Sequence, residues 1–493
     1  MSDEGQNIVE FSRVEYLALK QENEYLKQEL AQLKRLIFGK KNERFIPTDA
    51  GQSSLFEKSS TEQEPISEPQ TITYTKEKKK DKKQPVRLAL PAHLPREEEV
   101  IEPKDKQQDA VKIGEAVTEI LEYTPGKVYV KRYVRPKYVQ PSTSANHDKQ
   151  VIVAELPSLP IPSGNAGPGL LAHLMISKFM DHLPFYRQVQ MFKREGLKLS
   201  ESTIGGWFKA VCKLLEPLYE EIQKQVLASE YINADETTVP VQSSNKQGAT
   251  HTGYHWYYYS PKNKLVVVDY QPSRSAQGPG EFLREYKGVL QTDGYAGYEQ
   301  FAKKPGITLL ACMAHARRYF EKALDNDKKR AEHALREIQK LYAIERKAKE
   351  DKLNTDQLTE LRQTQALPIL NELHEWMKEQ YGKVAPKSSI GKALAYSIKL
   401  WERLVGYTQS GERYIDNNLV ENSIRPVALG RKNYLFAGSH DAAQCAAMMY
   451  SFLGCCKLND VEPFQWLKET LEKIQETTTC QLHTLLPNFQ QKS

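Results

Sequence analysis

Three acidic residues stand far apart in the sequence, each in a setting that suits metal and phosphate chemistry. Asp235 lies in an alternating segment, Asp293 directly follows a short apolar run, and Glu421 lies among asparagines. Two carboxylates a few ångströms apart repel each other unless a cation sits between them. Three such ligands leave coordination positions open for water and a phosphate, which predicts a site for two Mg²⁺ or Mn²⁺ ions.

The neighbourhood of Glu421 is basic as well as acidic. Arg425, Arg431 and Lys432 follow it within one segment and are candidate contacts for a DNA phosphate. Arg425 would share a helical face with Glu421, although Pro426 disfavours helical geometry in the residue before it. The alternative is a solvated helix end with a few ion pairs.

No single acidic residue identifies a catalytic site. An isolated aspartate is more often a helix cap or a surface residue than a metal ligand, and Glu236, Asp269 and Asp416 offer the same chemistry. The elements that carry the candidates therefore have to bring them together.

Alternating apolar segments predict the strands that would do so. We expect strands at Tyr231 to Val241, His255 to Ser260, Leu265 to Tyr270, Gly288 to Thr292 and Ile307 to Ala311. Three antiparallel-looking strands followed by strands alternating with helices predict an α/β fold with a mixed sheet of the ribonuclease-H type. The sheet domain is expected at 229–320 and 405–450, interrupted by a charged helical insertion at 321–404.

The chain before the sheet domain divides into four expected units. Heptad spacing from Tyr16 to Ile37 predicts a coiled-coil helix within 1–45, and Asn23 in its seam favours a parallel homodimer. A disordered basic linker is expected at 46–100 and a small hairpin module at 101–165, whose Arg132, Arg135 and Lys137 either contact DNA or protect a sheet edge. A helical region at 166–228 is a possible helix-turn-helix, with a cap at Ser200, and a C-terminal helical segment is expected at 451–493.

Composition limits the class of protein. The 493 residues exceed one compact core, and the net charge of +6 is small for this length. No apolar run is long enough to cross a bilayer and no secretion signal is visible, so a cytoplasmic protein without a membrane partner is expected. The six cysteines form no Cys-x-x-Cys pair and are expected to be reduced, mostly buried thiols.

Five segments together resemble one known protein family. They are Asn233 to Thr237, Leu290 to Tyr298, Cys312 to Phe320, Asn418 to Pro426 and Gly430 to Tyr434. In these segments, in the C-terminal segment from Ser439 to Ile474 and in the N-terminal coiled coil, the chain resembles the DDE transposases of the insertion sequence 66 family.

The resemblance implies specific roles. Asp235, Asp293 and Glu421 would form the metal-binding triad of a ribonuclease-H-like domain, while His315, Arg317 and Arg318 match a family motif that would hold phosphate or form structural ion pairs. The implied function is a transposase that cuts the terminal inverted repeats of a mobile element and joins them to target DNA. It would act near the bacterial nucleoid, with accessory proteins of the same element as possible partners.

Two alternatives remain open, and one feature departs from the family. The fold would also suit a structure-selective nuclease, and an inactive DNA-binding scaffold would keep the coiled coil and the basic linker. Family members commonly carry two Cys-x-x-Cys pairs that bind zinc before the catalytic domain. The matching region from Pro103 to Ser142 has no cysteine, so no zinc is expected.

Overall fold

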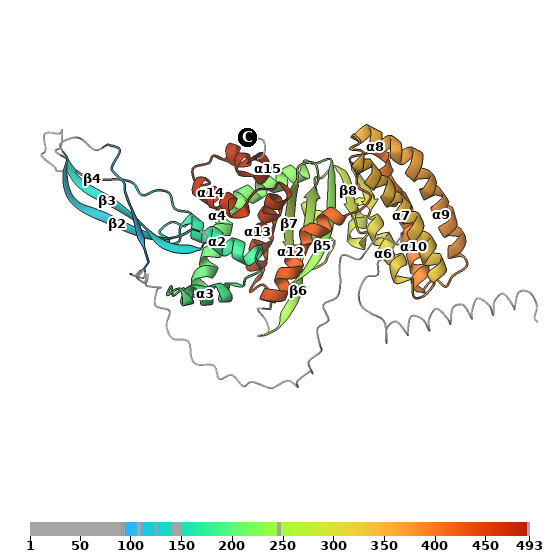
Figure 1. The fold of residues 1–493 in the computed structure, drawn as a ribbon, viewed down its shortest axis with the longest axis horizontal. Helices are drawn as coiled ribbons and strands as arrows, with labels where there is room; N and C mark the ends of the chain where they lie inside the picture. Colours follow the sequence, from blue (N-terminus) through green and yellow to red (C-terminus); the bar gives the residue numbers. More distant parts are fainter. Residues whose placement is uncertain are drawn as a thin grey trace, which may run out of the picture.

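The computed structural model describes Leu90, Ala92 and residues 94–490, apart from short gaps at 106–109, 125, 141–149 and 244–247. The predicted coiled coil with Asn23 lies outside the described residues, as does nearly all of the predicted linker. The described chain forms a small sheet, a central mixed sheet with helices packed around it, and a helical unit at one end (Figure 1).

The small sheet is larger than the predicted hairpin. Strands β2 (Val111–Thr124) and β3 (Lys127–Gln140) form a long antiparallel pair, and β4 (Gln150–Val153) pairs with β3 on its other side. Strand β1 (Arg96–Val100) pairs in parallel with β3, although it lies within 46–100, which was predicted to be a linker. Its charged sequence REEEV shows no apolar alternation, because its charged side chains pair with residues of β2 and β3 instead of entering a core.

Those partners explain the basic residues of the hairpin. Lys131 Nζ lies 3.0 Å from Glu99 Oε2, and Arg132 pairs with Glu98 across β1 and β3. Arg135 Nη1 donates to the carbonyl of Ala154 at 3.1 Å. Arg132 and Arg135 therefore make contacts within the module.

Three helices follow the small sheet. They are α2 (Pro168–Phe179), α3 (Phe185–Arg194) and α4 (Glu201–Leu227). The Ser200 hydroxyl accepts a hydrogen bond from Thr203 N at 3.0 Å, which confirms the predicted cap. Gly196 takes a φ of 82° at the turn between α3 and α4, a conformation that glycine adopts without steric cost.

The central sheet has the order β7-β6-β5-β8-β9 and mixes antiparallel and parallel strands, as the alternating segments predicted. Its strands are β5 (Tyr231–Gln242), β6 (Thr250–Ser260), β7 (Leu265–Gln271), β8 (Gly288–Thr292) and β9 (Ile307–Ala311). The first three are antiparallel neighbours, and β8 and β9 run parallel to β5.

The outer edge of β7 is covered by side chains from two helices. Val268 N donates to Ser451 Oγ at 2.8 Å, and Val268 O accepts from the Tyr219 hydroxyl at 2.7 Å. Cys455 Sγ contacts both backbone groups of Val266. An uncovered edge would be a template for pairing with another chain, so α4 and α13 (His440–Leu458) protect it.

The helical insertion has its own core. It comprises α7 (Lys328–Glu350), α8 (Thr355–Leu361), the π-helical turn η2 (Arg362–Ala366), α9 (Leu367–Tyr381), α10 (Ser389–Lys399), α11 (Trp401–Val405) and the 3-10 turn η3 (Gly406–Gln409). It follows α6 (Met313–Lys322), and the helices bury a hydrophobic cluster separate from that of the sheet.

The chain then returns to the sheet. Helix α12 (Asn418–Tyr434) lies across β5 and β6 (Figure 1). The C-terminal elements are α13, α14 (Pro463–Lys473), the 3-10 turn η4 (Thr479–Leu485) and α15 (Pro487–Gln490). Helix α13 runs continuously through position 450, where a unit boundary was expected.

Two predictions about composition can be checked here. Cys212, Cys312, Cys455 and Cys456 are buried free thiols, Cys445 is half-buried and Cys480 is exposed, as predicted for reduced and mostly buried cysteines. Within the described residues, every helix is too short or too polar to span a bilayer.

Candidate active site

The pleat of β5 separates the two acidic residues Asp235 and Glu236. Asp235 lies opposite Tyr257 of β6, which neighbours Tyr434 and Arg431 of α12. Glu236 lies opposite Trp256, on the other face of the sheet. There its carboxylate accepts from Arg274 Nε at 2.8 Å, and its side chain is 4% exposed. Asp235, rather than Glu236, faces α12.

Asp293 occupies the turn that follows β8. Its Oδ1 accepts from Tyr295 N at 2.8 Å, and its carbonyl accepts from the Tyr396 hydroxyl at 2.5 Å. Gly294 takes a φ of 84°, and a Cβ there would lie 2.6 Å from Leu400 of the insertion. The turn around Asp293 is therefore held directly by the helical insertion.

Glu421 lies in the first turn of α12, and a buried asparagine joins this helix to β5. Asn417 Nδ2 donates to the carbonyl of Ala234 at 2.8 Å, next to Asp235. Asn417 N also donates to Cys312 Sγ at 3.2 Å. Two buried hydrogen bonds therefore hold the start of α12 beside Asp235.

Helix α12 continues through Pro426. A proline in a helix interior removes one backbone hydrogen bond and costs about 3 kcal/mol. Burial of Val420 and Val427 in the core that includes the sheet offsets that cost.

Glu421 is paired with residues of α6. Its Oε2 accepts a short charge-assisted hydrogen bond from Arg318 Nη2, and its Oε1 lies 3.7 Å from His315 Nδ1. Arg318 Nη1 lies 3.1 Å from His315 Nε2. Because arginine only donates, Nε2 accepts and the proton of neutral His315 is on Nδ1. Burial and the Arg318 charge lower the pKa of His315.

The three predicted acids interact electrostatically. Burial, followed by repulsion from Asp293, Glu236 and Glu421, raises the pKa of Asp235 well above its usual value. These carboxylates are therefore close enough to Asp235 to destabilise its charge.

Their ligand atoms have not converged as closely as those of a second group. The second group consists of Cys312, His315 and Glu421. One possible ligand atom from each of these residues lies within 4.8 Å of the other two, which holds for no other group of histidine, cysteine and acidic residues in the described chain. Glu421 belongs to both sets, and its carboxylate is paired with Arg318.

The acidic set fits a hard divalent cation by the chemistry of its donors. Carboxylate oxygens are the ligands that Mg²⁺ and Mn²⁺ prefer, and a cation would relieve the repulsion at Asp235. Glu421 Oε1 is buried and lacks a hydrogen-bond partner, which leaves a donor atom for an ion. The second set fits poorly, because burial raises the pKa of the Cys312 thiol to about 12, whereas the thiolate is the form that binds a metal.

The other predicted DNA contacts differ in their surroundings. Arg317 pairs with Glu321 on its own helix at 3.1 Å. Arg431 Nη1 donates to Thr238 O at 2.7 Å, to Thr238 Oγ1 at 3.0 Å and to Thr237 Oγ1 at 3.1 Å, so it joins α12 to β5. Arg425 and Lys432 are exposed and could reach DNA.

Sequence reasoning missed the residues that position the acids. These residues donate hydrogen bonds to backbone carbonyls distant in sequence, and they are Asn417, Tyr396 and Gln291. Gln291 Nε2, for example, donates to Tyr414 O at 2.9 Å. The one sequence signal for these contacts was the pair of asparagines at 417 and 418 before Glu421. An asparagine that is buried needs several hydrogen-bond partners, so such a residue can connect segments distant in sequence.

Comparison with known proteins identifies the chain's relatives. Residues 163–445 match the family described as "Transposase IS66 family", residues 25–98 match "Transposase C of IS166 homeodomain", and residues 451–487 match "IS66 C-terminal element". The uncharacterized protein y4jD of Sinorhizobium fredii (strain NBRC 101917 / NGR234) is 30% identical over 496 residues, covering 94% of each chain. The uncharacterized protein y4hP of the same strain is 32% identical over 435 residues, covering 82% of this chain and 77% of the relative.

Proposed function

Because the chain belongs to the IS66 family of transposases, we propose that it cuts the ends of an insertion sequence and joins them to target DNA by phosphoryl transfer. The observation that supports the proposal is the charge repulsion that Asp293 and Glu421, which lie on two other elements, exert on the buried carboxyl group of Asp235. Structural ion pairs alone would not gather like charges in this way.

We further propose that the central domain is ribonuclease-H-like. The support is its sheet, in which three antiparallel strands are followed by two strands parallel to the first. Asp235 lies on the first strand and Asp293 after the fourth, on neighbours β5 and β8. We propose the predicted units with two changes: β1 belongs to the small sheet, and α13 crosses the boundary predicted at 450. The helices α7 to α11 form the insertion.

Asp235, Asp293 and Glu421 would hold Mg²⁺ or Mn²⁺, with no zinc elsewhere. When bound, such ions neutralise developing charge on the phosphate and lower the pKa of the attacking oxygen.

The chain's own residues then have separate tasks. Asn417 and Tyr396 orient the acidic groups through the backbone. Arg318, with exposed Arg425 and Lys432, would bind DNA phosphates, which arginine and lysine contact by charge-assisted hydrogen bonds. His315 would orient Arg318.

The proposed partners follow from this chemistry. They are the terminal inverted repeats, the target DNA, a second copy of the chain through the coiled coil, and accessory proteins of the same element. With DNA as substrate, the protein would act at the bacterial nucleoid.

The test is strand cleavage and strand transfer with purified full-length protein, Mg²⁺ and DNA carrying the element ends. Asp293→Asn removes one charge at constant shape and should abolish cleavage while DNA binding stays nearly unchanged. Asp269→Asn makes the same substitution on β7 of the same sheet and should cleave normally.

Three outcomes separate the readings. Full cleavage by Asp293→Asn would remove this residue from the site. Cleavage without strand transfer by the wild-type protein would favour a structure-selective nuclease. DNA binding without any metal-dependent cleavage would leave an inactive scaffold.

A further inference from the structure

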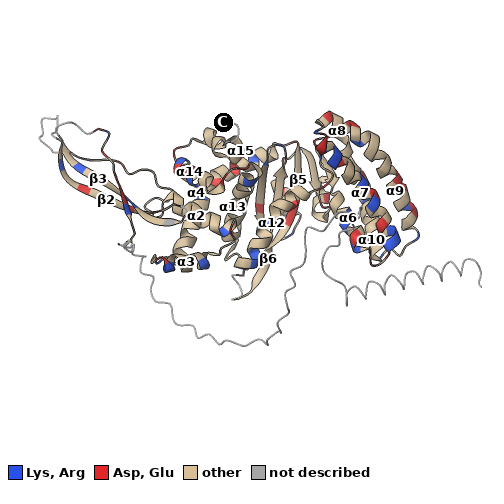
Figure 2. Cartoon of the chain, in the orientation of Figure 1, with Lys and Arg blue, Asp and Glu red and all other residues tan. Residues whose placement is uncertain are grey.

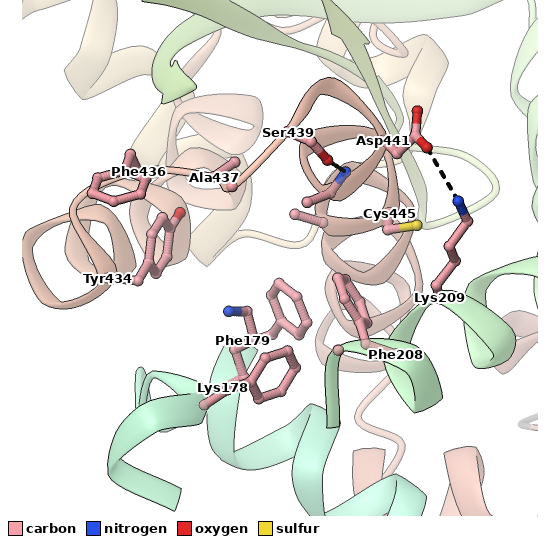
Figure 3. Close-up of a pocket in the computed structure, with 15 residues that line it drawn as sticks. Lys178, Phe179, Phe208, Lys209, Tyr434, Phe436, Ala437, Ser439, Asp441 and Cys445 are labelled. Carbon is pink, nitrogen blue, oxygen red and sulfur yellow. Dashed lines mark hydrogen bonds and ion pairs between the residues drawn. The ribbon is translucent and has the colours of Figure 1, made fainter. Parts of the chain in front are cut away.

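A pocket of about 300 Å³ lies beside the C-terminal end of α12, and its lining does not include Asp235, Asp293 or Glu421. Aromatic rings from several elements line it. Figure 3 shows Phe179 from α2, Phe208 from α4, Tyr434 at the end of α12 and Phe436 just after that helix. An ion pair between Lys209 and Asp441, 3.3 Å long, closes part of its rim. The pocket is therefore mainly apolar with charges at its margin.

One positive charge inside the pocket lacks an acidic partner. Lys178 Nζ lies 4.1 Å from the ring centroid of Phe185, 5.6 Å from that of Tyr434 and 5.7 Å from that of Phe179. Burial lowers the pKa of Lys178 to about 8, and among the described residues no carboxylate raises it. In the part of the chain that the structure describes, the amine is surrounded by the ring faces of these three residues.

The end of α12 presents apolar side chains to solvent instead of burying them. Leu435 takes a φ of 65°, unusual for a bulky residue, and is 65% exposed. Phe436 follows it at the pocket and is 42% exposed. Strained backbone that holds an aromatic ring in water suits a surface that another molecule covers.

We propose that this pocket binds an unpaired nucleobase of the DNA substrate between its aromatic rings, with the adjacent phosphate on Lys178. Every base has a π-face that stacks on aromatic side chains, so the rings account for the base. The Lys178 amine, which has no carboxylate partner among the described residues, would bind the phosphate.

Charge around the pocket favours nucleic acid over an apolar protein segment. Helix α3, which contributes Phe185 to the pocket, carries Arg187, Lys193 and Arg194 and no acidic residue. Basic residues mark both ends of α3 in Figure 2. A strand entering the pocket would therefore have its backbone beside positive charge.

The pocket is connected to the candidate active site through one rigid element. Glu421 lies in the first turn of α12 and Tyr434 is its last residue. At 1.5 Å per residue the helix separates them by about 20 Å, comparable to about six steps of a DNA strand at 3.4 Å each. The inference thus rests on the proposed function: a base held here would set the position of the strand relative to the acids.

The experiment compares two probes on the full-length protein in EDTA, where cleavage is not needed. One is a short fluorescein-labelled oligothymidylate, and the other is an abasic oligomer of the same length and charge. The wild-type protein should prefer the oligothymidylate. Phe436→Ala should weaken that binding by roughly 5- to 150-fold, the range expected for one stacked base, and should leave the abasic oligomer unaffected.

Lys178→Met tests the phosphate contact separately. It should weaken both probes and reduce the slope of log affinity against log salt by about 0.7, the value for one phosphate on a single strand. Phe489→Ala is the matched control, because Phe489 is 40% exposed on α15 and does not line the pocket. It should bind both probes like the wild-type protein.

The proposal is overturned if the wild-type protein binds both probes equally, or if Phe436→Ala keeps the preference for bases. Cross-linking with a 5-iodouracil oligonucleotide should attach at Tyr434 or Phe436, and attachment only elsewhere would also overturn it. An altered oligomeric state of Phe436→Ala with unchanged DNA binding would instead assign the surface to a second copy. Because these readouts exclude metal, they remain interpretable if the cleavage test contradicts the transposase proposal.

Discussion

Removing the charge of Asp235 should stabilise the metal-free protein while destroying its response to Mg²⁺. In the folded protein, burial and repulsion from Asp293, Glu236 and Glu421 raise the pKa of this carboxyl group well above its usual value. A carboxyl group with a raised folded-state pKa lowers stability wherever it is ionised in the unfolded chain. Asp235→Asn removes this penalty at neutral pH.

The size of the effect can be calibrated on Asp269 of β7. Burial raises its pKa to about 6 from 3.8, which corresponds to an upper limit of about 3 kcal/mol before solvent screening. The penalty is fully present above pH 6 and disappears as the pH falls below 3.8. Asp269→Asn should therefore gain up to about 3 kcal/mol at pH 7.5, and Asp235→Asn should gain more.

The assay is thermal unfolding of both variants and the wild-type protein, in EDTA and in Mg²⁺. A ligand at a hundred times its Kd stabilises the folded state by about 2.7 kcal/mol. The wild-type protein and Asp269→Asn should show this gain, and Asp235→Asn should not. A lower midpoint for Asp235→Asn in EDTA, or an unchanged Mg²⁺ response, would refute the assignment of Asp235 as a strained metal ligand.

Two further predictions concern contacts that sequence alone did not show. Arg318→Gln should free Glu421 and raise Mn²⁺ affinity by about 10- to 150-fold, since a charge-assisted hydrogen bond contributes about 1.5–3 kcal/mol. Arg317→Gln breaks the pair with Glu321 on the same helix and should leave Mn²⁺ affinity unchanged. Equal Mn²⁺ titrations of the two variants would contradict this role of Arg318. Arg362→Met should lower the free energy of unfolding by about 3–5 kcal/mol, because buried Arg362 donates to Glu345 at 2.8 and 2.6 Å and to Ser410 O at 2.7 Å. Replacing the exposed Lys378 with methionine should change the free energy of unfolding by less than about 1 kcal/mol. Both variants are measured by urea titration. Similar losses of stability in Lys378→Met and Arg362→Met would contradict the prediction for Arg362.

The strands of the central sheet were predictable because their signal is local. Alternation from Tyr231 to Val241 and the apolar run from Gly288 to Thr292 are read from neighbouring residues, and β5 and β8 match them closely. Strand β1 was missed because its charged side chains are satisfied across the sheet by Lys131 and Arg132. No pattern within REEEV records that pairing.

Residue type and context made Asp235, Asp293 and Glu421 candidates, as they did other acidic residues of the chain. The resemblance of the surrounding segments to the insertion sequence 66 family then singled out these three. Tertiary structure decided their relations. The pleat of β5 directs Glu236 to the opposite face, Asn417 attaches α12 beside Asp235, and Arg318 pairs with Glu421. It also decided that α12 continues past Pro426, since packing of Val420 and Val427 exceeds a cost that local propensity would count against the helix. Contacts between residues a hundred or more positions apart depend on how the whole chain packs, and local sequence holds no record of them.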